Sequence, residues 1–214
     1  MKPNDGGFRG DGYEVRPIKS SIGKAFIREH HYSHSCHNGP MCYGLVTEER
    51  LIGVLAFATP CSENVRRSVY GPGREGEVTE LHRLVILDET RTNAESWFIS
   101  RALRQLKRDR PKYSAVVSFS DATEGHTGTI YQATNAIYQG STSKAWFYRD
   151  GEGRLRHPRQ NGHNVTVAEA TDKGWVRERR DAKRRYLFLL GGKAERRKNR
   201  AALVRESYPY PERE

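Results

Sequence analysis

Residues 113–140 read YSAVVSFSDATEGHTGTIYQATNAIYQG. The first part, Tyr113–Phe119, alternates and is rich in β-branched and aromatic residues, which predicts a strand. The polar pair Ser120 and Asp121 ends that strand. A buried strand that ends in polar residues and runs through a loop into a helix places ligand chemistry at the carboxyl end of a sheet.

The second half of this stretch predicts the elements that follow the strand. Glu124–Thr127 is expected to form a turn, and a short helix is expected over about Thr127–Ala136. A further strand begins near Ile137. The plain alternative for the whole stretch is a strand, a turn and a helix in which Asp121 serves only as a helix cap.

The rest of the chain predicts a mixed sheet covered by helices, an α/β (α+β) fold. Strands are expected at Tyr13–Ile18, Met41–Thr47, Leu51–Thr59, Val78–Leu87, Ser143–Tyr148, Val165–Ala168 and Tyr186–Leu190, and helices from Ser20 or Ser21 to His37 and from Asn93 to about Arg108. Loops are expected at 60–76 and 154–164. The predicted organisation is a loose arm over 1–12, a catalytic domain over 13–150 and a basic extension over 151–214 that contacts DNA.

The composition points to a polyanionic partner. The 214 residues carry a formal net charge of +11 and a pI of about 9.7, and such a balance favours nucleic acid. No apolar run is long enough to span a membrane, and the N-terminus lacks the apolar segment of a secretory signal. Three cysteines, Cys36, Cys42 and Cys61, indicate a reducing compartment without a disulfide framework.

Histidines and cysteines cluster between the first helix and the second strand. The cluster contains His30, His31, His34, Cys36, His37 and Cys42. Imidazole and thiolate are common ligands of zinc and iron, so a metal role is one interpretation. The spacing contains no C-x-x-C pair, and the other interpretation is a polar loop followed by Cys42 in the core of a strand.

Basic side chains gather in two other regions of the chain. The predicted loop at 60–76 and the segment near 177–185 together supply seven candidate DNA contacts: Arg66, Arg67, Arg74, Arg179, Arg180, Arg184 and Arg185. Aromatic residues are interleaved with the second group, which fits phosphate contact combined with base stacking. A solvated charged surface is the alternative.

Neither a G-x-x-x-x-G-K-[ST] loop nor a G-x-G-x-x-G turn is present, so a P-loop or Rossmann nucleotide site is not expected. The order of elements resembles the GCN5-related N-acetyltransferase (GNAT) fold. That resemblance implies acetyl-CoA or a related acyl donor, held by Val85 and Leu87 on a strand and by Arg91, Asn93 and Ser96 around the next helix start. The bend at 88–94, DETRTNA, lacks the glycine-rich signature that such enzymes use for pyrophosphate.

Four segments together resemble a narrower family. EHHYSHS at 29–35, ELHRLVI at 80–86, SWFISRALRQL at 96–106 and SFSDATEGHTGTIYQATN at 118–135 look like the phage Mom DNA-modification proteins, which have a GNAT-like fold. The resemblance implies a DNA adenine-modifying enzyme that adds a carbamoylmethyl or acetamido-type group to N6 and protects phage DNA from host restriction. It also implies iron, and action in the cytoplasm of the host cell.

The same resemblance supplies the candidate site residues. His31, Asp121 and Tyr131 are the implied metal ligands, and Asp121, Tyr131, Tyr32 and Ser120 are the implied catalytic residues. The target is expected to be double-stranded DNA with a flipped adenine, because N6 is unreachable inside the stack. We expect Asp121→Ala to abolish modification and to leave folding near normal.

Two other function classes stay open from the sequence. One is a GNAT acyltransferase that acts on a protein or on a small-molecule amine. The other is a non-catalytic DNA-binding protein in which the histidine and cysteine cluster holds a structural metal.

Overall fold

The computed structural model describes residues 8–48, 50–60, 62–160 and 163–212. The chain forms two compact units. The first comprises Met1–Phe119, Gly128–Gly140 and Arg185–Glu214, and the second comprises Ser120–Thr127 and Ser141–Arg184. Residues 151–214, predicted as one extension, are therefore shared between the two units.

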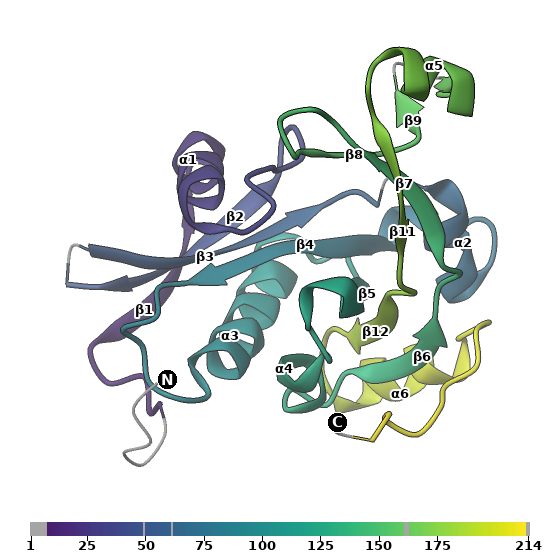
Figure 1. Ribbon diagram of the computed structural model, residues 1–214. Helices are drawn as coiled ribbons and strands as arrows, with labels where there is room; N and C mark the ends of the chain where they lie inside the picture. Colours follow the sequence, from purple (N-terminus) through teal and green to yellow (C-terminus); the bar gives the residue numbers. More distant parts are fainter. Residues whose placement is uncertain (1–7, 49, 61, 161–162, 213–214) are drawn as a thin grey trace. The chain divides into compact units, whose positions relative to one another are not determined.

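A seven-stranded mixed sheet forms the centre of the first unit (Figure 1). Its order is β1-β2-β3-β4-β5-β12-β6, with β1 at Tyr13–Ile18, β2 at Met41–Thr47, β3 at Arg50–Ala58, β4 at Val78–Ile86, β5 at Ala115–Ser120, β12 at Arg184–Leu189 and β6 at Ile137–Ser141. Strands β1 to β4 pair antiparallel, whereas β4 and β5 run parallel. The predicted mixed sheet is confirmed.

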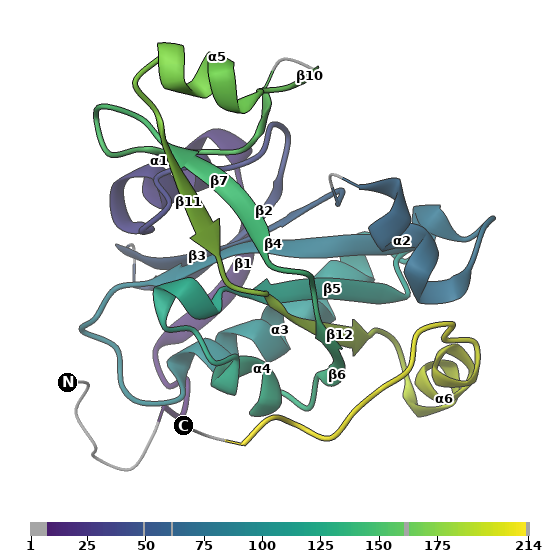
Figure 2. The same cartoon turned by 45° about the vertical axis from the view of Figure 1, so that its right-hand side comes forward.

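Helices cover both faces of this sheet. Helix α1 (Ser20–His30) lies on one face and α3 (Ala94–Asp109) on the other, as Figures 1 and 2 both show. Alternation along the strands divides the core accordingly. In β3, Val54 and Ala56 pack with α1, while Leu55 and Phe57 pack in the cluster that contains α3 residues.

The pairing between β4 and β5 is short. It runs from Val78 opposite Ala115 to Leu81 opposite Ser118, and both strands continue beyond that point. A bulge in β4 lies at the same place, because Leu81 pairs with Phe57 and Arg83 pairs with Ala56, which leaves His82 without a partner across the ladder. Bulges of this kind re-aim side chains and are common beside active sites.

The second unit contains two small sheets. Strands β11 (Val176–Arg180), β7 (Ala145–Arg149) and β8 (Leu155–Arg156) form one antiparallel sheet, and β9 (Arg159–Gln160) pairs with β10 (His163–Asn164). Helix α5 (Val167–Asp172) packs against the first of these through a small core of Tyr148, Val165, Ala170 and Trp175.

Several sequence-based expectations are wrong. The region 60–76 contains α2 (Glu63–Tyr70), because Val65, Val69 and Tyr70 lie at helical spacing and pack into the core. The strand expected at Val165–Ala168 is instead the start of α5, which begins with a capping box formed by Thr166 and Glu169.

The bounds of two helices were also predicted wrongly, and one helix and three short strands were not predicted. Helix α1 ends at His30 rather than at His37, because His31 takes an extended conformation. Helix α4 spans only Thr129–Gln132 and follows Gly128, whose φ is 83°. The basic tail contains α6 (Lys193–Ala201), which was not predicted, and the expected loop at 154–164 contains β8, β9 and β10.

Candidate active site

Tyr131 lies at the centre of a polar group in the first unit. Its side chain comes from α4, and the residue is only 7% exposed. It hydrogen-bonds with Ser118, the β5 residue at which the pairing with β4 ends. Burial raises the pKa of Tyr131 to about 12, and Tyr32, Glu80 and Tyr186 add to the rise. Tyr131 therefore carries its phenolic proton throughout the physiological range.

The bulge in β4 contributes an imidazole and a carboxylate. The Nδ1 atom of His82 lies 3.6 Å from Oε1 of Glu80, and the His82 side chain is 7% exposed. The other ring nitrogen, Nε2, is buried and has no hydrogen-bond partner among the described residues. A buried polar atom without a partner costs free energy, so this nitrogen is a candidate for contact with a bound molecule.

The loop after α1 brings more imidazoles to this region. The His37 ring stacks on the His82 ring with centroids 3.7 Å apart. Burial lowers the pKa of His37, and the neighbouring His82 lowers it further. His31 is buried and accepts a hydrogen bond at Nδ1 from the Ser33 backbone N–H at 3.1 Å, and its ring lies 4.3 Å from that of Tyr32. Tyr32 in turn interacts electrostatically with Tyr131 and raises its pKa, which links this loop to that residue.

Asp121 belongs to the second unit, where cations surround it. Its carboxylate accepts a hydrogen bond from Nη2 of Arg180 at 3.1 Å and lies 3.2 Å from Nζ of Lys183. It also accepts from the backbone N–H of Thr123 and so caps the 3-10 turn at Ala122–Glu124, as the plain alternative proposed. Burial favours the neutral acid, but Lys183 and Arg180 outweigh it and hold the pKa of Asp121 below its ordinary value. Asp121 is therefore an ionised carboxylate near neutral pH.

The donor groups proposed for iron do not fit a metal. Asp121 has its oxygens engaged by Arg180, Lys183 and Thr123, and Nδ1 of His31 accepts from the Ser33 backbone N–H. Among the described residues no group of three or more His, Cys, Asp or Glu side chains is arranged to hold an ion. We derive no step through a metal.

The histidine and cysteine cluster divides among separate environments. Cys42 is buried in β2 against α1, as the strand-core interpretation expects, and burial raises the pKa of its thiol to about 12. His34 bonds to the backbone oxygen of Arg28, and His30 stacks on Phe26. Cys61 lies outside the described residues.

The residues proposed for an acyl donor lie on two elements of the first unit. Val85 is on β4, and Leu87 directly follows that strand. Asn93 is the residue before α3, with φ of 72°, and its carbonyl oxygen accepts from the Ser96 hydroxyl at 3.0 Å. Arg91 precedes it in an exposed turn.

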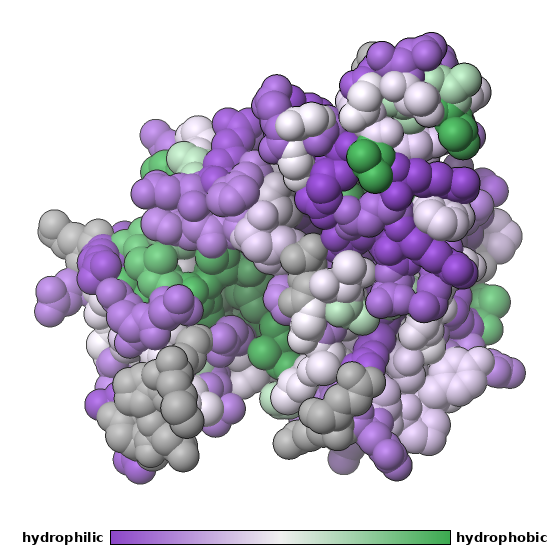
Figure 3. Space-filling model, viewed as in Figure 1, coloured by the Kyte–Doolittle hydropathy of each residue, from purple (hydrophilic) through white to green (hydrophobic). Residues whose placement is uncertain are grey.

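The free half of β4 exposes apolar side chains. Leu84, Ile86 and Leu87 are half-buried at the edge of the main core. Figure 3 shows hydrophobic surface where Figure 1 draws β4 and α3. An apolar surface beside a helix N-terminus suits a ligand with both an acyl chain and phosphates.

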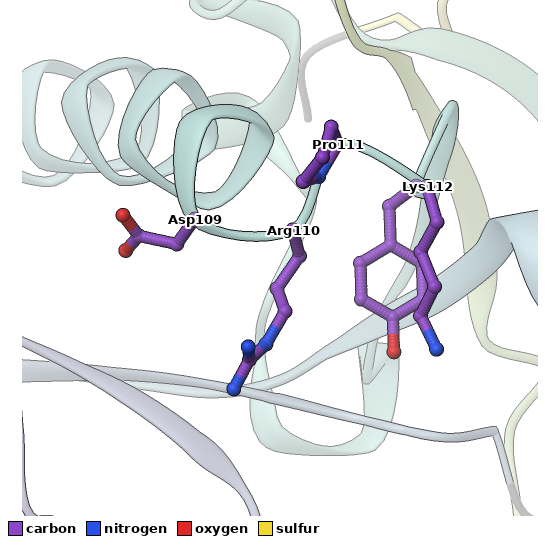
Figure 4. Close-up of a pocket in the computed structure, with 5 residues that line it drawn as sticks. Asp109, Arg110, Pro111 and Lys112 are labelled. Atoms are coloured by element: carbon purple, nitrogen blue, oxygen red, sulfur yellow. The ribbon is translucent and has the colours of Figure 1, made fainter.

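A hollow lies at the C-terminal end of α3. Asp109, Arg110, Pro111, Lys112 and Tyr113 line an open depression of about 410 Å³ (Figure 4). None of the predicted site residues lines it. Asp109 is engaged there by the Tyr43 hydroxyl at 2.9 Å, which indicates a structural use of this carboxylate.

The arginines predicted to contact DNA in the first unit differ in availability. Arg67 pairs with Glu63 and Glu75, and Arg74 pairs with Glu77 at 2.6 Å. Arg185 is 4% exposed and donates to the Ser68 hydroxyl, and burial lowers its pKa to about 10. These contacts give Arg185 a structural role, and its burial makes it a poor candidate for DNA contact. Arg66 has no ion pair within the described part of the chain.

The second unit holds the other three arginines. Arg180 is buried against Asp121, and Arg184 donates to the backbone oxygen of Thr127 at 3.0 Å. Arg179 is exposed and lies near the ring of Trp146. The three therefore have distinct surroundings, and Arg179 is the most accessible of them.

Sequence reasoning missed Glu80, His82 and Ser118 as candidate site residues. Two of these lie in ELHRLVI, a segment already singled out for its resemblance. The signal was a carboxylate and an imidazole two residues apart, which places both on one face of a strand. No sequence pattern predicted the bulge beside them.

A family model now places the chain among known proteins. The model of the Mom protein family matches residues 12–212. The chain belongs to the Mom protein family. It is also 26% identical over 208 residues to the methylcarbamoylase Mom of Escherichia phage Mu, a match that covers 95% of this chain and 86% of the relative.

The fold is that of the GNAT acetyltransferases. The crystal structure of a ribosomal-protein-S5-alanine acetyltransferase from Vibrio fischeri superposes with a TM-score of 0.51 at 11% identity, over 87% of this chain and 97% of that one. At this identity the likeness shows the fold alone. Both the resemblance to the Mom family and the GNAT-like mixed sheet expected from the sequence are confirmed.

Proposed function

We propose that this Mom-family chain is a transferase that modifies adenine N6 in phage DNA with a carbamoylmethyl or acetamido-type group. Membership of the family and the name of the phage Mu relative support a group transfer of this kind. The net charge of +11 supports a polyanionic substrate. The modification protects phage DNA from host restriction enzymes in the host cytoplasm. The observation that carries the proposal is the pair of proton-handling groups at the β4 bulge.

His82 is the proposed proton acceptor. When N6 of adenine forms a bond to carbon it loses a proton, and its lone pair is poorly nucleophilic until that proton is removed. Nδ1 of His82 lies 3.6 Å from Glu80 and 3.5 Å from Nη1 of Arg83, and in the tautomer with its proton on Nδ1 the Nε2 lone pair is available. Glu80 then stabilises the imidazolium that forms. Asp121 stays a second candidate for this role, although three donors already engage its carboxylate.

Tyr131 is the proposed proton donor. The phenol holds its proton in the free protein, and this proton passes to the leaving atom of the donor as the bond to the transferred carbon breaks. Ser118 orients the phenol through its hydrogen bond. Tyr32 and His31, which interact with each other and lie near Tyr131, are proposed to position the adenine. Ser120, a buried residue of the second unit whose hydroxyl has no hydrogen-bond partner in the described part of the chain, is proposed separately as a DNA contact.

An acyl-CoA-type molecule is the proposed donor. Transfer of its acyl group to N6 breaks the thioester C–S bond and releases the CoA thiolate, which takes up the proton of Tyr131, and the product is an N6 amide; the N–CH2 bond of a carbamoylmethyl group is not formed by acyl transfer. The half-buried residues at the end of β4 supply an apolar surface, and the backbone N–H groups at the start of α3 attract phosphate. Val85, Leu87, Arg91, Asn93 and Ser96 are the proposed contacts. The bend at 88–94 has no glycine, so we expect phosphate binding there to rely on Arg91 more than on close backbone approach.

The proposal is tested by mass spectrometry of nucleosides. DNA from cells that express the chain is digested, and adenosine with the added mass is compared with DNA from cells that lack the chain. We expect a modified deoxyadenosine only in the first sample. Unmodified adenine together with a modified protein or small-molecule amine would instead favour the acyltransferase alternative. DNA binding without any new product would favour the non-catalytic alternative.

A further inference from the structure

The second unit carries an exposed aromatic residue between two arginines. Trp146 on β7 is 43% exposed. The guanidinium carbon of Arg177 lies 4.0 Å from the Trp146 ring centroid, and that of Arg179 lies 5.7 Å from it. An indole flanked by two guanidinium groups is an unusual surface to leave open to solvent, because a large apolar ring gains free energy from burial.

The register of the small sheet places these three side chains together. Trp146 pairs with Arg179, and Tyr148 pairs with Arg177, so all four residues share one face of the sheet. Tyr148 is buried against α5 with Trp175. Trp146 lies two residues nearer the start of β7 and stays exposed. The sheet thus provides a covered half and an open half on the same face.

The two arginines lack the acidic partners that neighbouring basic residues have. Arg149 pairs with Glu178 at 2.7 Å, and Arg180 pairs with Asp121. Within the described part of the chain neither Arg177 nor Arg179 makes an ion pair, and the nearby Asp181 pairs with Lys144 at 2.6 Å. The open half of the sheet therefore combines two arginines that make no ion pair within the described residues with one aromatic ring.

We propose that Trp146, Arg177 and Arg179 form a binding site for an unpaired stretch of DNA strand. A nucleobase stacks on the indole or on a guanidinium plane, and the adjoining phosphates contact the two arginines. The proposal rests on the proposed function, since it takes DNA as the substrate. It adds a strand-binding site, built from the second unit alone, that the chemistry at β4 does not require.

An unpaired strand fits this surface better than an intact duplex. In a duplex both faces of each internal base are covered by its neighbours, so an indole finds no base face to stack on. Modification of adenine N6 needs the base out of the stack, and extraction leaves unpaired nucleotides close to the target. Arginine contacts to phosphate alone would serve a duplex equally well, so the tryptophan is the discriminating residue.

Binding to two fluorescently labelled oligonucleotides of the same sequence tests the site, one single-stranded and one fully paired. For Trp146→Ala we expect about 10-fold weaker binding of the single strand and a smaller change for the duplex. Trp146→Phe keeps an aromatic face and is expected to bind the single strand close to wild type. The double variant Arg177→Gln/Arg179→Gln is expected to weaken both and to reduce the salt dependence of binding.

The double variant Arg196→Gln/Arg197→Gln removes two exposed charges from α6 and serves as the matched control. It is expected to change the preference for the single strand little. Wild-type binding of the single strand by Trp146→Ala would overturn the proposal, and so would an equal loss for strand and duplex.

Nucleoside analysis of wild-type reactions, run in parallel, reports separately on the proposed function. Modification by the wild type together with unchanged binding by Trp146→Ala refutes only the strand site. Absence of modification, with the Trp146 effect intact, refutes only the adenine chemistry. A circular dichroism melt confirms that each variant is folded.

Discussion

Tyr131 and Asp121 are ten residues apart in the sequence, and their surroundings are opposite in kind. Tyr131, in the first unit, is a buried neutral acid whose pKa is raised by burial and by neighbouring acidic groups. Asp121, in the second unit, is an ionised carboxylate held by Arg180 and Lys183. One residue keeps its proton and the other has lost it, so the two are suited to different tasks.

The contrast separates proton transfer from charge pairing. A group that gives or takes a proton during a reaction needs an atom that is not already held by a charged partner. In the first unit, Tyr131 is a neutral phenol and Nε2 of His82 has no hydrogen-bond partner among the described residues. Asp121 is better suited to hold a fixed negative charge and to order its own unit.

The largest expected effect is on the stability of the second unit. Asp121→Ala leaves the buried guanidinium of Arg180 without its carboxylate partner and the backbone N–H of Thr123 without its acceptor. We therefore expect the unfolding free energy to fall by about 3–5 kcal/mol. Urea unfolding followed by tryptophan fluorescence in a Trp97→Phe background reports on this unit. The expectation from sequence that this variant folds normally is therefore revised.

Asp181→Ala is the matched control for that measurement, because Asp181 pairs with exposed Lys144. We expect a change of about 0.5 kcal/mol or less. Equal unfolding free energies for Asp121→Ala and Asp181→Ala would show that the contact between Asp121 and Arg180 does not stabilise the protein.

Loss of the phenolic proton donor has the next largest effect. Tyr131→Phe keeps the ring and its packing and is expected to lower the rate of adenine modification about 100-fold. The melting temperature is expected to change little. Tyr43→Phe removes another buried hydroxyl, one bonded to Asp109, and is expected to leave the rate unchanged. A wild-type rate for Tyr131→Phe would remove Tyr131 from the mechanism.

A smaller effect is expected from the carboxylate beside His82. Glu80→Gln keeps the shape of the side chain and removes the charge that stabilises the imidazolium, which we expect to lower the rate about 10-fold. Single-turnover rates on target DNA measure this effect, and a thermal melt reports on the fold. A lower rate together with a lower melting temperature would give Glu80 a purely structural role.

The smallest effect is a pH dependence of stability. The pKa of Asp121 is lowered in the folded state, so its contribution is fully present above the ordinary carboxyl value of about 3.9 and is lost as the pH falls through the folded value. The wild type is expected to lose stability more steeply than Asp121→Asn below about pH 4. Parallel urea midpoints between pH 5 and pH 3 provide the comparison.

Much of the first unit was predictable because its elements have strong local patterns. The apolar runs of β2, β3 and β4 and the spacing of Phe98, Ala102 and Leu106 in α3 all matched the elements found. Helix α2 was missed because its polar, arginine-rich sequence hides only a few buried positions, among them Val69 and Tyr70. Its burial depends on strands that are distant in sequence.

The candidate site was predictable only in part. The polar end of β5 and the helix that carries Tyr131 were visible in the sequence, whereas the meeting of Tyr131 with Ser118 and its interaction with Glu80 depend on the parallel pairing of β4 and β5. Which donors surround Asp121 was equally hidden, because Arg180 and Lys183 are about sixty residues away in the sequence.

The proposed role of His82 as proton acceptor is tested most directly by the single-turnover rate of adenine modification by purified His82→Gln on target DNA. His30→Gln, which changes a histidine stacked on Phe26, is the matched control. We expect a rate at least 100-fold below wild type for His82→Gln, with DNA binding and melting temperature unchanged, and a normal rate for His30→Gln. A wild-type rate for His82→Gln would contradict the assignment of proton transfer to the β4 bulge.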